Sequence, residues 1–90
     1  DDAVILLDEA GKLINSQDLS RKLTEYFNRS KNIVFVIGGA YGVHDALFER
    51  ADFIWSLSPL VFPHQLVRLI LTEQIYRAQE IDAGHPYHHE

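Results

Sequence analysis

Three short apolar runs punctuate the chain at positions 3–7, 33–37 and 53–57. The first two are continuous: Ala-Val-Ile-Leu-Leu and Ile-Val-Phe-Val-Ile. Unbroken apolar runs of this length, without polar alternation, are typical of strands buried on both faces of a parallel sheet. We therefore predict three parallel strands in one sheet.

The segments between these runs have helical periodicity. After Ser16, a potential helix cap, Leu19 and Leu23 recur at the spacing of one helix face, and Asp18 lies in the first turn, where the helix dipole favours it. Residues 45–51 predict a short second helix. Pro63 is suited to open a third, which we expect to run to about Ile81. The order β-α-β-α-β-α predicts an α/β fold, with a single domain over residues 1–90.

The third predicted helix is apolar around most of the circumference of its first half, at Leu66, Val67, Leu69, Ile70 and Leu71. One side can face the sheet, and the other must be buried elsewhere. A second copy of the chain would cover it, so we expect a homodimer.

Composition supports a folded domain, since 47% of the residues are hydrophobic and 11% are aromatic. The formal charge of −5 argues against a general nucleic-acid coat, because nonspecific phosphate affinity rests on Lys and Arg. The absence of Cys excludes disulfides and thiolate metal sites.

No apolar run approaches membrane-spanning length, so a cytoplasmic location without membrane contact is expected. The chain has no Met, and we expect its natural start to be missing.

Three loops follow the carboxyl ends of the predicted strands, at residues 7–11, 38–42 and 58–63. In open parallel sheets, ligands bind at this edge. Gly38 and Gly39 would let a ligand approach the main chain, although they would equally suit a tight turn. The prolines of the third loop stiffen either an apolar ligand wall or a buried connection. No dinucleotide or P-loop glycine pattern is present, which disfavours phosphate-rich cofactors.

The chain ends in a segment, residues 84–90, that contains three His, one Tyr and one Glu. These groups are suited to acid–base chemistry, although chain ends are commonly frayed and solvated. A zinc site is disfavoured because structural zinc takes four fixed ligands, so no metal is expected.

Five blocks of the sequence together resemble a known family. They are Val-Ile-Gly-Gly-Ala-Tyr-Gly at 36–42, Trp-Ser-Leu-Ser at 55–58, Pro-His-Gln-Leu-Val-Arg at 63–68, Glu-Gln-Ile-Tyr-Arg-Ala at 73–78 and His-Pro-Tyr-His at 85–88. In this order and spacing the chain is similar, from Ala3 onward, to the ribosomal RNA large subunit methyltransferase H family of the SPOUT class.

The resemblance implies a homodimer with a deep trefoil knot that binds S-adenosyl-L-methionine. It also implies methylation of N3 of a pseudouridine in large-subunit rRNA of the ribosome, and an N-terminal portion that this chain lacks. Carried over by position, cofactor contacts fall on Leu7, on Gly39 and on the third loop. The residues of that loop are Ser58, Pro59, Leu60, Val61, Phe62 and Pro63.

The same resemblance places His88, Tyr87 and Arg77 on the substrate side. N3 of a uracil ring is protonated at neutral pH, so His88 or Tyr87 is expected to accept its proton, with Arg77 steadying negative charge. Many relatives have Pro-Glu in place of Ala40-Tyr41 and Arg in place of His89, so neither Tyr41 nor His89 receives a role. Two other functions stay open: a binder of a different nucleotide on an ordinary α/β fold, and a noncatalytic dimeric interaction module.

Overall fold

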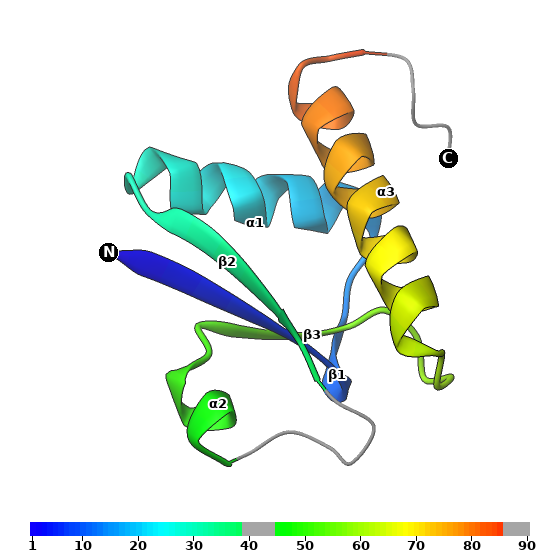
Figure 1. Ribbon diagram of the computed structural model, residues 1–90. Helices are drawn as coiled ribbons and strands as arrows, with labels where there is room; N and C mark the ends of the chain where they lie inside the picture. Colours follow the sequence, from blue (N-terminus) through cyan, green and yellow to red (C-terminus); the bar gives the residue numbers. More distant parts are fainter. Residues whose placement is uncertain (39–44, 86–90) are drawn as a thin grey trace.

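The computed structural model describes residues 1–38 and 45–85, whose elements follow the predicted order. They are β1 (Asp2–Leu13), α1 (Ser16–Asn28), β2 (Asn32–Ile37), α2 (Asp45–Arg50), β3 (Phe53–Ser56) and α3 (His64–Asp82). The strands form one parallel sheet in the order β2-β1-β3 (Figure 1). The predicted α/β class and parallel sheet are confirmed.

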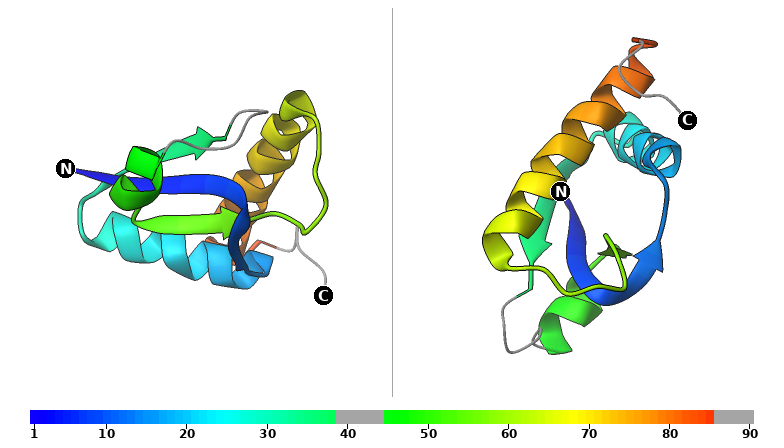
Figure 2. Two further views of the ribbon diagram at one scale, coloured as in Figure 1. Left: turned by 90° about the horizontal axis from the view of Figure 1, so that it is seen from below. Right: turned by 90° about the vertical axis from the view of Figure 1, so that its right-hand side faces the viewer.

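Alternate residues of the central strand β1 face two different layers. Ala3, Ile5 and Leu7 join the main core with residues of α1, β3 and α3. Val4 and Leu6 point to the other face and are also buried. Helices α1 and α3 cover the first face, and the short α2 lies on the opposite side of the sheet (Figures 1 and 2). The predicted burial of β1 on both faces is therefore confirmed.

The same prediction is wrong for β2, which lies at the edge of the sheet. No residue of Asn32–Ile37 is fully buried, and Val34 is 39% exposed. An apolar run alone does not distinguish a central strand from an edge strand, because both are built from β-branched and aromatic residues.

Strand β1 is longer than predicted because it curves round the end of β3. Leu7 pairs with Trp55, and after an irregularity Lys12 pairs with the same residue. At Gly11, a Cβ atom would lie 2.7 Å from the Ile54 carbonyl group and 2.8 Å from the Trp55 nitrogen. Glycine is therefore required where the two backbones meet. The trefoil knot implied by the resemblance stays a prediction.

The helix boundaries follow local capping chemistry. Asn15, not the predicted Ser16, is the N-cap of α1: its side chain accepts from the Asp18 N–H, and Asp18 accepts in return from the Asn15 N–H. In α3, Pro63 is the N-cap, and the helix ends one residue beyond the predicted Ile81. Gly84, at φ 77°, completes a Schellman turn in which its N–H donates to the Ile81 carbonyl and the His85 N–H to that of Glu80.

Side chains tie α1 to α3 at both ends of their contact. Ser16 Oγ donates to Gln74 Oε1 at 2.7 Å, and Thr24 Oγ1 donates to Asp82 Oδ1 at 2.9 Å. Apolar side chains remain on the outer surface of α3 among polar ones: Leu66 is 40% exposed and Leu69 is 67% exposed. Leu71, by contrast, is buried in the core. Within the described ranges, no helix combines the length and the apolar character that a bilayer span requires.

Candidate cofactor site

A cavity of about 550 Å³ opens at the carboxyl edge of the sheet, where the three loops were predicted to meet. Its volume falls in the range of small-molecule sites. The described residues that line it come from all three strand ends and from the start of α3. They are Leu7, Asp8, Glu9, Ile37, Gly38, Trp55, Leu57, Ser58, Leu60, Val61, Phe62, Pro63, His64 and Val67.

The curve of β1 supplies the acidic part of this lining. Because β1 turns after Leu7 to meet β3 again, Asp8 and Glu9 lie at the edge of the sheet beside the cavity. The turn is fixed locally, since the Ala10 N–H donates to Asp8 Oδ2 at 2.9 Å. This is an Asx-type turn, a conformation that Asp readily adopts.

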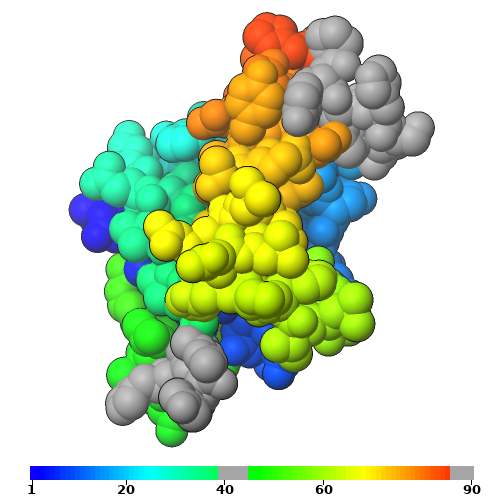
Figure 3. Space-filling model, turned by 45° about the vertical axis from the view of Figure 1, so that its right-hand side comes forward, coloured from blue at the N-terminus to red at the C-terminus, as the bar shows by residue number. Residues whose placement is uncertain are grey.

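The third loop, residues 58–63, forms an apolar rim of the cavity, and serine hydroxyl groups stabilise its backbone. Ser56 Oγ donates to the Ser58 carbonyl at 3.0 Å, and the Leu60 N–H donates to Ser58 Oγ at 3.0 Å. Leu60 is 68% exposed and Val61 is 79% exposed, although both border the cavity. The loop lies beside the first turns of α3 on one face of the molecule (Figure 3). The alternative of a buried connection is therefore wrong for these two residues.

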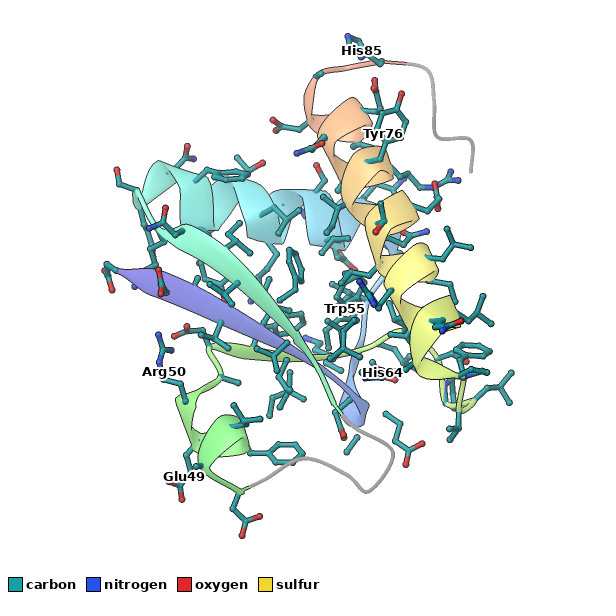
Figure 4. The ribbon with its side chains drawn as sticks, in the orientation of Figure 1. Glu49, Arg50, Trp55, His64, Tyr76 and His85 are labelled. Carbon is teal, nitrogen blue, oxygen red and sulfur yellow. The ribbon has the colours of Figure 1, made fainter. Side chains whose placement is uncertain are left out.

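One side chain joins the second and third loops. His64, the first residue of α3, lies within 2.7 Å of the Gly38 carbonyl oxygen through its Nε2 atom (Figure 4). A carbonyl oxygen only accepts, so Nε2 carries the proton. The Gly38 N–H donates to the Leu7 carbonyl at 3.3 Å. Gly38 is thus bonded to the ends of both β1 and α3.

The ionisable lining of the cavity is acidic. Among the described lining residues there is no Lys or Arg, and the ionisable ones are Asp8, Glu9 and His64. A negatively charged ligand would gain no direct ion pair here, whereas a cationic group would meet two carboxylates. The site therefore favours a ligand with apolar surface and positive charge over a polyphosphate.

Arg77 lies outside this lining, farther along α3. Its guanidinium pairs with Glu73 at 3.0 Å, and both side chains are about one-quarter to one-third exposed. Gln74 Nε2 donates to Glu73 Oε1 at 2.9 Å, and Ser16 donates to Gln74, so a chain of polar contacts leads from α1 to Arg77. A smaller hollow of about 290 Å³ lies beside Gln74 and Ser16, and Trp55 and Leu57 line both hollows.

Comparison with known proteins agrees with the family resemblance noted in the sequence. A family model described as "Predicted SPOUT methyltransferase" matches residues 1–88. The chain belongs to the SPOUT methyltransferase family.

Individual relatives of this SPOUT chain share nearly half of its residues. "Ribosomal RNA large subunit methyltransferase H" of Thioalkalivibrio sulfidiphilus is 48% identical over 87 residues, covering 97% of this chain and 56% of the relative. The proteins of the same name from Psychrobacter sp. and Acetivibrio thermocellus are each 48% identical, over 92% and 94% of this chain and 51% and 54% of their own lengths. The chain thus spans about half the length of the curated relatives it matches.

Most of the residues predicted for the SPOUT cofactor site meet in the cavity. Leu7 and five of the six third-loop residues line it, and the exception is Pro59. Gly39, Tyr87 and His88 lie outside the described residues, so their roles stay predictions. His85, the first residue of the predicted substrate segment, does lie among the described residues. Its hydrogen bond to Glu80 holds the pKa of the Glu80 carboxyl below its ordinary value.

Three polar residues of the cavity, Asp8, Glu9 and His64, were not named as site residues from the sequence. Asp8 and Glu9 were within the first predicted loop, but nothing in the sequence showed that β1 would curve and carry them along the cavity. His64 stood next to Pro63 in a block that carries the family resemblance. Its position at a helix start beside a predicted ligand loop was the available signal.

Proposed function

We propose that this chain is the cofactor-binding portion of an S-adenosyl-L-methionine-dependent methyltransferase that acts on N3 of a pseudouridine in large-subunit rRNA. The observation that carries the proposal is the cavity itself. It lies where Leu7 and residues 58–63 were predicted to contact the cofactor, and its described lining joins apolar walls to Asp8 and Glu9. The printed name of the relatives supplies the class of substrate.

The described residues fit this cofactor. Leu57, Leu60 and Val61 offer apolar surface to a purine ring, and the stiff backbone of the third loop offers amide and carbonyl groups to its polar edge. The carboxylates of Asp8 and Glu9 in the same lining suit a cofactor that carries a sulfonium and an ammonium group. When bound, S-adenosyl-L-methionine supplies the methyl group, and the protein supplies orientation.

The substrate side needs a group that accepts the N3 proton and a cation that stabilises the anionic ring. We assign the first role to His88 or Tyr87 and the second to Arg77. Arg77 is held by Glu73, which fixes the orientation of its guanidinium. The homodimer, the ribosome as partner and the cytoplasm as location belong to the same proposal.

Calorimetric titration separates this proposal from a binder of another nucleotide. The chain should bind S-adenosyl-L-methionine and should not bind NAD, because the described lining offers no Lys or Arg to a pyrophosphate. A Gly39→Val variant should lose binding, whereas Lys12→Ala, which changes an exposed residue away from the cavity, should not. Binding of NAD in place of S-adenosyl-L-methionine would contradict the proposal.

Methyl incorporation separates catalysis from a noncatalytic dimeric module. The chain joined to the N-terminal portion of the Thioalkalivibrio relative should transfer methyl groups to ribosomes. Deleting residues 85–90 should abolish transfer and leave cofactor binding largely intact. His88→Ala and Tyr87→Phe then identify the base, whose loss should lower turnover by roughly a hundredfold. Full activity after the deletion would show that residues 85–90 have no catalytic role and are a solvated chain end.

A further inference from the structure

The hydrogen bond between His64 and Gly38 joins two walls of the cavity that are distant in sequence. Gly38 ends the wall that follows β2, and His64 follows directly on the third loop, whose last residue is Pro63. The bond spans 26 positions at a distance of 2.7 Å. From this geometry we propose that His64 is a positioning residue of the cofactor pocket, one that holds these two walls at a fixed separation. The inference rests on the proposed function.

Gly38 is the residue through which the bond acts on the pocket. Its N–H is already engaged by the Leu7 carbonyl, and its carbonyl is engaged by His64. These two groups belong to the peptide units before and after the Gly38 Cα, so the first unit is held to β1 and the second to the start of α3. The backbone that leads into the predicted cofactor contact at Gly39 therefore leaves the sheet from a fixed point.

His64 is placed to act on ligand affinity more than on stability. Its side chain belongs to an exposed residue at the first turn of α3, outside the main core, so its removal leaves no buried cavity. A loop that is not held must be ordered when a ligand binds, and that ordering weakens binding. Loss of one hydrogen bond of this kind should therefore raise the dissociation constant roughly fivefold to tenfold.

The ring nitrogen that donates defines a conservative replacement. Because Nε2 carries the proton, the amide of Gln can place a donor near the same point, whereas Leu is of similar size and has no donor. Gln65, the next residue of α3, is exposed and absent from the described lining. His64→Gln, His64→Leu and the matched control Gln65→Ala therefore separate the hydrogen bond from general disturbance of the helix start.

The test is calorimetric titration of the chain and its three variants with S-adenosyl-L-methionine, alongside thermal unfolding of each. His64→Leu should bind roughly fivefold to tenfold more weakly, His64→Gln should restore most of the affinity, and Gln65→Ala should match the parent chain. In the chain joined to the N-terminal portion of the Thioalkalivibrio relative, His64→Leu should raise KM for the cofactor and leave kcat nearly unchanged.

Two outcomes would overturn the positioning role while leaving the proposed function intact. If the parent chain binds and His64→Leu binds equally well, the bond does not shape the pocket. If His64→Gln is as weak as His64→Leu, a donor at this point is not what matters. Failure of the parent chain to bind S-adenosyl-L-methionine would instead overturn the proposed function, and this inference with it.

Discussion

Ser16 at the start of α1 donates a hydrogen bond to Gln74 in the middle of α3, across 58 positions of the sequence. Gln74 Oε1 accepts the hydrogen bond from Ser16, so the Gln74 amide is oriented with its Nε2 toward Glu73. Glu73 is in turn the partner of Arg77. The packing of the two helices is thereby connected to the residue proposed to stabilise charge on the substrate.

Replacing Gln74 by Leu should remove both hydrogen bonds, the one from Ser16 of α1 and the one to Glu73. We expect the free energy of unfolding to fall by about 1 kcal/mol, the usual net contribution of such hydrogen bonds. In the chain joined to the N-terminal portion of the Thioalkalivibrio relative, kcat should also fall, since the Glu73–Arg77 pair loses the hydrogen bond from Gln74. The exposed Gln79, replaced by Leu, is the matched control. Urea denaturation and single-turnover methyl transfer measure the two effects. An unchanged kcat would show that the hydrogen bonds of Gln74 do not affect the function of Arg77.

Gly11→Ala should destabilise the fold because the new methyl group would meet the backbone of Ile54 and Trp55 at 2.7–2.8 Å. These atoms belong to the backbone of β3, which is paired with β1, and overpacking of this kind costs about 1–3 kcal/mol. Lys12→Ala, at the neighbouring exposed position, should have little effect. Equal urea midpoints for Gly11→Ala and the parent chain would show that β1 does not cross β3 this closely.

Asp52 should make stability depend on pH. Its carboxylate accepts from the Val4 N–H at 2.7 Å, and this bond, followed by that from Arg50, holds its pKa below the ordinary aspartate value. A lowered folded-state pKa stabilises the protein above the unfolded-state pKa of roughly 4, and the contribution disappears as pH falls through the folded value. Asp52→Asn should therefore be less stable than the parent at pH 7.

The same comparison at acid pH is the check on this assignment. Thermal unfolding of both chains between pH 7 and pH 3 should show the difference shrinking as the parent's carboxyl becomes protonated. Asp45→Asn on α2 removes the same charge at another site and is the control for general charge effects. A constant difference across this range would show that the Asp52 charge does not stabilise the β1–β3 contact.

Leu69→Glu should prevent the proposed homodimer. Leu69 is 67% exposed on α3, and Leu66 and Tyr76 are also exposed on this helix. An obligate interface is expected to bury on the order of 2,000 Å² or more in total, and a carboxylate within it would be left without solvent. Asn28→Glu adds the same charge on α1. Sedimentation should give a dimer for the parent and for Asn28→Glu, and a monomer for Leu69→Glu. A monomeric parent would contradict the dimer.

The candidate site was partly predictable because its loops are defined by strand ends. Apolar runs located the ends of the strands, and the parallel arrangement placed the three following loops at one edge. The three loops could therefore be named in advance, and the family resemblance then placed cofactor contacts on Leu7 and on the residues of the third loop. His64 was not named, because its bond to Gly38 depends on the angle at which α3 leaves the third loop.

The sequence by itself determined the order of elements, the parallel sheet and the apolar surplus of α3. Each follows from the local periodicity of hydrophobic residues, which is written in consecutive positions. Only the tertiary structure decided that β1 curves round β3, that β2 lies at the edge and that Ser16 meets Gln74. Such contacts join residues 26–58 positions apart, and their geometry depends on how α1, α3 and the strands pack around the Trp55 and Ile5 core, so no local pattern specifies them.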